Sequence, residues 1–126
     1  MNRLPRPVYL NLFRIHLPLM GWVSILHRLS GAMLFLSFPF AVWLLSKSLT
    51  HEAGFEALRA WFALPLAKLL VLGLVGLFAL HFFAGLRHLV MDVHWGVTLT
   101  AARRSSLGVL VLTGAVTVAV AWVLFA

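Results

Sequence analysis

The sequence predicts an all-α integral membrane protein with three transmembrane helices, and three observations support this prediction. The 126-residue chain is 63% hydrophobic. Only 10% of its residues are charged, whereas a typical soluble domain has about 25%. Its apolar residues form three contiguous runs, without the polar face that a soluble helix needs. Because backbone groups inside a bilayer must satisfy their own hydrogen bonds, each run is expected to be a helix.

A membrane-spanning helix needs about 20 mainly apolar residues, and each run meets this length. Within a single transmembrane domain, residues 1–126, the expected helices are approximately residues 22–46, 64–92 and 105–126. The connection after the first helix is polar and is expected to include a short helix around Glu52 to Arg59. The second connection, Val93 to Ser106, is expected to carry Arg103 and Arg104.

The basic residues predict the orientation of the chain, because Lys and Arg favour the cytoplasmic side of a membrane. Seven lie on the side of the N-terminal segment and the second connection: Arg3, Arg6, Arg14, Arg28, Arg87, Arg103 and Arg104. Three lie on the other side: Lys47, Arg59 and Lys68. We expect a bacterial inner-membrane protein with a cytoplasmic N-terminal segment, residues 1–21, and a periplasmic C-terminus. The net charge of +7 is then explained by topology and lipid phosphate, and no nucleic-acid partner is expected.

Polar side chains gather at the cytoplasmic ends of the first two spans. On the first span the positions i, i+3, i+4 and i+7 of one helix face are Ser24, His27, Arg28 and Gly31. On the second span one face has His81, Gly85 and His88, and Arg87 and Asp92 close the helix. The two spans are antiparallel, so these faces are expected to meet. Ionisable groups are costly in a bilayer and tend to mark functional sites.

His81 lies deepest, about 16 Å from Asp92 along the helix at 1.5 Å per residue. Gly85, one turn away, leaves space on the same face where a flat macrocycle could lie. Haem iron accepts a neutral imidazole as an axial ligand, and the apolar surroundings suit a porphyrin. At the aqueous edge, haem propionates could be neutralised by His27, Arg28, Arg87 and His88.

Structural roles remain open for the same residues. A lone intramembrane histidine can simply hydrogen-bond to a neighbouring helix, and glycines can serve close helix packing. Terminal arginines such as Arg28 and Arg87 can extend to lipid headgroups. No second histidine lies as deep as His81, so if the haem is six-coordinate with two histidines, the other ligand is expected from a different chain. His27 is a weaker internal alternative.

Two sequence blocks resemble the cytochrome b subunits of succinate dehydrogenase. They are S-I-L-H-R-L-S-G at residues 24–31, after Arg6-Pro7-Val8, Leu10, Leu12 and Pro18, and H-F-F-A-G-L-R-H at residues 81–88, before Met91-Asp92. The resemblance covers nearly the whole chain, but outside these blocks it is mostly hydrophobic character.

This resemblance implies a role in complex II. A flavoprotein subunit there oxidises succinate, an iron–sulfur subunit passes the electrons to ubiquinone, and two small membrane anchor subunits share a b-type haem. The chain would be one half of this heterodimeric haem-binding helical bundle. It has no flavin motif and no cluster ligands, so it is not expected to oxidise succinate by itself.

The resemblance also implies roles for individual residues. His81 would be the axial ligand of the haem iron, with the second histidine on the other anchor subunit. Ser24 would donate a hydrogen bond to a quinone oxygen, and Arg28 would stabilise the reduced oxygen and face a propionate. His27 would contact a propionate. His88 and Arg87 would make propionate or structural contacts.

Three other functions compete with this one. The same scaffold could anchor a quinol:fumarate reductase, in which electrons flow in the opposite direction. It could also be a haem-free structural anchor in which His81 only packs. A small transporter or proton-conducting subunit would need ionisable residues deep on several helices, and the third span offers only Thr113 and Thr117.

Overall fold

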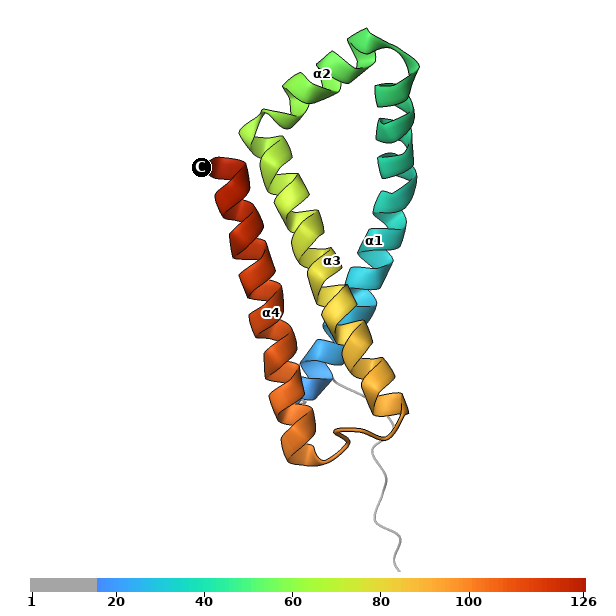
Figure 1. Ribbon diagram of the computed structural model, residues 1–126. Helices are drawn as coiled ribbons and strands as arrows, with labels where there is room; N and C mark the ends of the chain where they lie inside the picture. Colours follow the sequence, from blue (N-terminus) through green and yellow to red (C-terminus); the bar gives the residue numbers. More distant parts are fainter. Residues whose placement is uncertain (1–15) are drawn as a thin grey trace, which may run out of the picture.

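A computed structural model describes residues 16–126, and this part of the chain is built from helices without strands. The helices are α1 (Leu19–Thr50), α2 (Glu52–Phe62), α3 (Pro65–Asp92) and α4 (Leu99–Phe125). The long helices α1, α3 and α4 alternate in direction, and α2 bridges the end where α1 and α3 lie apart (Figure 1). All three long helices are long and apolar enough to cross a membrane, which confirms the predicted all-α transmembrane fold.

Two helices differ from their expected bounds: α1 extends beyond residues 22–46 at both ends, and α4 begins before residue 105. This helix begins at Leu99, so Arg103 and Arg104 lie in its first turns, and the prediction that they belong to a connection was wrong. The Thr98 side chain caps the helix by accepting a hydrogen bond from the Ala101 N–H at 3.3 Å. Because this cap stabilises the first turn, the helix can begin before the apolar run does. The basic residues Arg3, Arg6 and Arg14 and the segment up to Leu12 lie outside the described residues.

The connection between α1 and α2 is a sharp turn at one residue. His51 is extended, with φ −150° and ψ 148°, and separates the two helices by itself. Gly54 lies so close to the end of α1 that a Cβ atom there would be 2.5 Å from the Lys47 carbonyl oxygen. Any larger residue at position 54 would therefore force the two helices apart.

The end of α3 has a Schellman motif. The His94 N–H bonds to the Met91 carbonyl at 2.9 Å, and the Trp95 N–H bonds to the Val90 carbonyl at 3.2 Å. His94 takes the left-handed conformation, with φ 61°, that usually falls to glycine at this position. The motif stops α3 and directs the chain toward α4.

Most of the apolar surface is uncovered. Val23, Ala84 and Val109 form a small buried core where α1, α3 and α4 meet. Even in the most covered of the three candidate spans, only 11% of the apolar window is buried. A soluble monomer rarely exposes so much continuous apolar surface, so lipid or another chain must cover the exposed faces of these helices. The protein is a multi-pass membrane protein.

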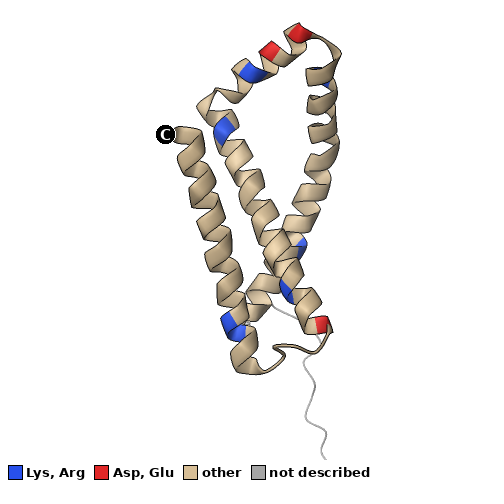
Figure 2. Cartoon of the chain, in the orientation of Figure 1, with Lys and Arg blue, Asp and Glu red and all other residues tan. Residues whose placement is uncertain are grey.

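Charged residues lie toward the two ends of the long helices and leave an apolar band between them (Figure 2). At the α2 end, the Lys68 amine donates a hydrogen bond to the Leu124 carbonyl and lies 5.5 Å from the centre of the Phe125 ring. A cation at a helix C-terminus is favourable because the helix dipole is negative there. Lys68 thus ties the start of α3 to the end of α4.

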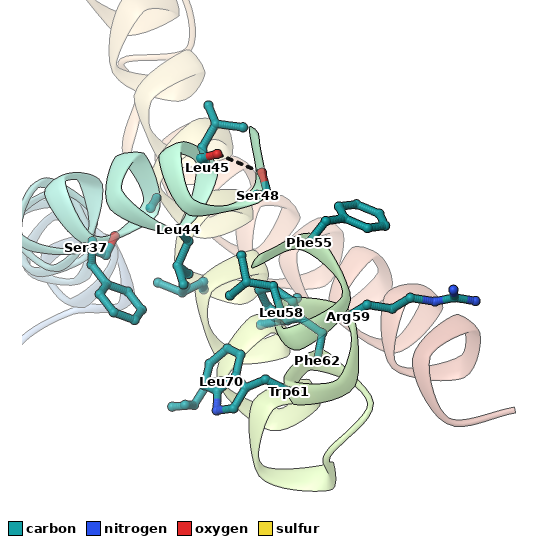
Figure 3. Close-up of a pocket in the computed structure, with 14 residues that line it drawn as sticks. Ser37, Leu44, Leu45, Ser48, Phe55, Leu58, Arg59, Trp61, Phe62 and Leu70 are labelled. Atoms are coloured by element: carbon teal, nitrogen blue, oxygen red, sulfur yellow. Dashed lines mark hydrogen bonds between the residues drawn. The ribbon is translucent and has the colours of Figure 1, made fainter. Parts of the chain in front are cut away.

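α1 and α3 diverge toward α2, and a cavity of about 700 Å³ lies between these three helices (Figure 3). Its walls are almost entirely apolar, including Phe40, Leu44, Leu58 and Trp61. Arg59 is the one charged residue among those that line it, and no histidine takes part. The cavity is therefore separate from the polar residues at the opposite end of α1 and α3.

Candidate functional site

Three histidines meet between α1 and α3. The His27 ring of α1 stacks on the His81 ring of α3, with centroids 4.3 Å apart and planes inclined by 13°. The His88 ring lies 5.1 Å from the His27 ring at an inclination of 48°. His81 and His88 are seven residues apart, about two turns, so both point toward α1. The structure thus brings together the two polar helix faces that the sequence placed at one membrane level.

The backbone of α1 fixes the His81 imidazole. Its Nδ1 lies 3.0 Å from the His27 carbonyl oxygen and 3.4 Å from Ser30 Oγ. The Ser30 hydroxyl also donates to the same His27 carbonyl at 2.9 Å. A carbonyl oxygen can only accept, so Nδ1 must carry the proton. In the neutral imidazole the lone pair is then on Nε2, which is the nitrogen available to a metal.

Gly31 makes this arrangement possible. A Cβ atom at position 31 would lie 2.8 Å from His81 Cε1 and 3.2 Å from Nδ1, closer than side chains approach one another. Gly85 of α3 faces the His27 ring, but a Cβ atom there would be 3.4 Å from His27 Nε2, which is an ordinary contact distance. Gly31 therefore is the glycine that gives the His81 imidazole room against α1.

Arg87 faces a different helix from the histidines. Its side chain is buried, and its Nε donates to Ser105 Oγ at 3.0 Å. Its Nη2 donates to the Ala102 carbonyl at 3.4 Å. Of the two roles expected for Arg87, these contacts match the structural one. Ser105 was not identified from the sequence, because position 105 was expected at the boundary between a connection and a helix.

We expect Arg87→Ala to lower the stability of the protein markedly. The variant loses the hydrogen bond from the charged Arg87 side chain to Ser105 Oγ, which joins α3 to α4, and such a bond contributes about 1.5–3 kcal/mol. Thermal unfolding of the purified protein measures the effect. Arg104→Ala is the matched control, since Arg104 lies exposed on α4, and equal melting temperatures for the two variants would contradict the role given to Arg87.

Ser24 and Arg28 lie on α1 one turn apart, at the same end as the histidines. Ser24 is half-buried and Arg28 is exposed. Within residues 16–126 neither side chain has a hydrogen-bonding or ion-pair partner. In this part of the chain, a hydroxyl and a guanidinium thus lie one helical turn apart at the end of α1 that holds the histidine cluster.

The histidine cluster does not hold a metal ion by itself. In the part of the chain that the structure describes, no three His, Cys, Asp or Glu side chains are arranged to bind one. His81 can donate one nitrogen, so any metal it binds must receive its other ligands from a cofactor or from another chain.

Comparison with known proteins gives one family. Residues 2–121 match the family model described as succinate dehydrogenase/fumarate reductase transmembrane subunit. The chain is 34% identical over 114 residues to the succinate dehydrogenase cytochrome b556 subunit of Coxiella burnetii (strain RSA 493 / Nine Mile phase I), covering 86% of this chain and 87% of that protein. It is 30% identical over 109 residues to the succinate dehydrogenase cytochrome b556 subunit of Paracoccus denitrificans, covering 83% and 81%.

Proposed function

Because this chain belongs to the family of succinate dehydrogenase/fumarate reductase transmembrane subunits, we propose that it anchors succinate dehydrogenase, complex II, in the membrane, binds a b-type haem and forms part of the ubiquinone-reduction site. Its partners are a second small anchor subunit, an iron–sulfur subunit and a flavoprotein subunit. The observation that supports the proposal is the His81 imidazole, whose Nδ1 is hydrogen-bonded to a backbone carbonyl, so that its Nε2 would be the nitrogen that binds the iron.

The residues between α1 and α3 fit a haem. His81 is only half-buried by this chain, which leaves room for a group shared with another subunit. Its neighbours Phe78 and Phe82 are exposed on α3 and would lie against an apolar macrocycle. His27 and His88, on the aqueous side of His81, would donate hydrogen bonds to the propionates. When bound, the haem supplies a reversible one-electron carrier.

A second histidine ligand for the haem would come from the other anchor subunit, because two imidazoles that hold one macrocycle would need space for it between them. His27 and His81 are stacked with centroids 4.3 Å apart, and this separation leaves no room for a porphyrin and its iron. His27 is therefore excluded as the opposing ligand in this arrangement, which supports a bundle completed by a partner chain.

Ser24 and Arg28 form this chain's part of the quinone site. Quinone reduction adds two electrons and two protons to the quinone oxygens. The Ser24 hydroxyl donates a hydrogen bond to one oxygen, and the Arg28 guanidinium stabilises negative charge as it develops. Both residues lie at the membrane edge, which is apolar enough for the quinone and still close to water.

The orientation follows from the same charges. Arg28, Arg87, Arg103 and Arg104 lie toward the end of the helices that holds the histidines. Basic residues favour the cytoplasmic side, so we place this end inside, with residues 1–21 in the cytoplasm and the C-terminus in the periplasm of a bacterial inner membrane. The iron–sulfur subunit then docks on the cytoplasmic face above Ser24 and Arg28.

Affinity purification of the chain from its native membrane tests the proposed function. A flavoprotein, an iron–sulfur protein and a second small membrane protein should co-purify, and the assembly should reduce quinone with succinate. A faster reaction of fumarate with quinol would instead assign the chain to a quinol:fumarate reductase. Purification without a succinate-oxidising partner would contradict the proposal.

We expect Gly31→Ala to lower the haem content of the complex several-fold. A methyl group at position 31 would lie 2.8 Å from His81 Cε1 and displace the ring from its carbonyl partner, and loss of such a support weakens metal binding about 10- to 100-fold. A pyridine haemochromogen assay per mole of complex measures the loss.

Gly73→Ala is the matched control for this variant. It adds the same methyl group to a helix, but a Cβ atom at position 73 has nothing within 4 Å. Equal haem content in the two variants would show that Gly31 does not support the haem ligand.

A further inference from the structure

We propose that Ser30 is a positioning residue that tunes the haem ligand through a shared backbone carbonyl. The Ser30 hydroxyl and the His81 imidazole both donate to the His27 carbonyl oxygen, and the strength of one bond limits the strength of the other. The inference rests on the proposed ligation of haem by His81. It adds a role for a serine that neither the quinone site nor the propionate contacts use.

The geometry places three donors at one acceptor. Ser30 Oγ lies 2.9 Å from the His27 oxygen, and His81 Nδ1 lies 3.0 Å from it. A carbonyl at this position of an α-helix also accepts the N–H four residues later. A carbonyl oxygen has two lone pairs, so the three donors compete for the same electron density.

Burial makes this competition matter. The Ser30 residue is 1% exposed, and in a membrane its surroundings contain little water that could replace a missing hydroxyl. Hydrogen bonds in a low-dielectric environment are electrostatically stronger and polarise one another. Removal of the Ser30 hydroxyl should therefore change the strength of the His81 Nδ1–H hydrogen bond, and water should not take the place of the hydroxyl.

Ser30 could act on His81 in two opposite ways, and the distances decide between them. By donating to the His27 carbonyl at 2.9 Å, the Ser30 hydroxyl weakens the hydrogen bond that this carbonyl accepts from His81 Nδ1–H. By accepting from His81 Nδ1–H at 3.4 Å, the hydroxyl would add to the hydrogen bonding of the Nδ1 proton. An N–H···O separation of 3.4 Å lies beyond the usual range of about 2.7–3.2 Å, so the first effect dominates.

The sign of the effect on the haem follows. A stronger bond from Nδ1–H makes an imidazole a more basic ligand, and a more basic ligand favours the oxidised metal. The native hydroxyl moderates this bond. Without the Ser30 hydroxyl, the His27 carbonyl accepts a stronger hydrogen bond from His81 Nδ1–H. The oxidised haem is then stabilised relative to the reduced haem.

Redox titration of the haem in the purified complex tests the inference. In Ser30→Ala the ratio of reduced to oxidised haem at a fixed potential should fall about three-fold, the effect of a modest hydrogen-bond change. At 59 mV per tenfold for one electron this is a shift of about 30 mV to more negative potential. Ser30→Thr keeps the hydroxyl and should restore the native potential. Ser30→Cys, whose thiol is a weak donor, should shift it in the same direction as alanine.

Ser37→Ala is the matched control. Ser37 lies on the same helix and donates to the carbonyl three residues earlier, Leu34, at 2.8 Å, just as Ser30 does to His27. The histidine cluster lies at Ser30 and not at Ser37, so Ser37→Ala should leave the potential unchanged.

The outcomes separate this inference from the proposed function. An unchanged or more positive potential in Ser30→Ala, or a shift equal to that of Ser37→Ala, would overturn the role of Ser30 and leave haem ligation by His81 intact. If Ser30→Ala does not assemble, Ser30→Cys decides by the same criterion. A native complex without haem would instead contradict the proposal that His81 binds a haem.

Discussion

Replacing His81 by alanine should remove the haem from the complex. The variant loses the imidazole that is proposed to bind the iron, and the stacked His27 ring is not placed to replace it. Loss of an outer-shell support alone lowers metal affinity about 10- to 100-fold, so loss of the ligand itself should leave less than about a tenth of the native haem. The measurement is haem per mole of flavin in the purified complex, so that unassembled protein does not count.

Two further variants make this result interpretable. His51→Ala removes an exposed histidine at the opposite end of α1 and should keep the full haem content. His81→Met supplies a thioether in place of the imidazole and should retain haem with an altered spectrum and a raised potential. Native haem content and spectrum in His81→Ala would show that the iron is bound elsewhere.

Replacing Arg28 by alanine should slow quinone reduction about 10- to 100-fold, which is the range for loss of a hydrogen bond from a charged donor. Succinate oxidation with a soluble artificial acceptor should be unaffected, because that reaction does not use the membrane site. The comparison of the two assays in one preparation measures the effect. Arg28→Lys should restore part of the rate, since it keeps the charge and loses the planar fork of donors.

The control for Arg28 is Arg59→Ala, which removes an exposed arginine from α2 and breaks only its 3.6 Å ion pair with Glu56. Both assays should remain at the native rate in this variant. An equal loss of both activities in Arg28→Ala would indicate failed assembly, and unchanged quinone reduction would remove Arg28 from the quinone site.

The long helices could be predicted from the sequence because the bilayer imposes one solution on an uncharged run of this length. The start of α4 at Leu99 could not, since it depends on the side chain of Thr98 capping a polar first turn that hydrophobicity does not mark. The cavity beside α2 was also unexpected. It exists because α1 and α3 diverge, and helix crossing angles are set by side-chain packing and not by apolar length.

At the histidine cluster, helical periodicity was sufficient to place His27, His81 and His88 on facing helix surfaces. It did not identify which polar groups would bond to them. The role of Ser30 depends on its bond to the His27 carbonyl and on the position of His81 beside that carbonyl. The position of His81 is set by how α3 packs against α1, which the sequence pattern does not specify. Likewise, the sequence left both a propionate and a structural contact open for Arg87, and α3 turns its side chain toward Ser105 on α4.

The absorption spectrum of the purified assembly, before and after addition of succinate, tests the central claim most directly. A haem ligated by His81 and by a second histidine from a partner chain predicts a Soret band and the sharp reduced bands of a six-coordinate b-type haem. An assembly that oxidises succinate and reduces quinone but has no Soret absorption would contradict the claim and leave the chain as a haem-free anchor.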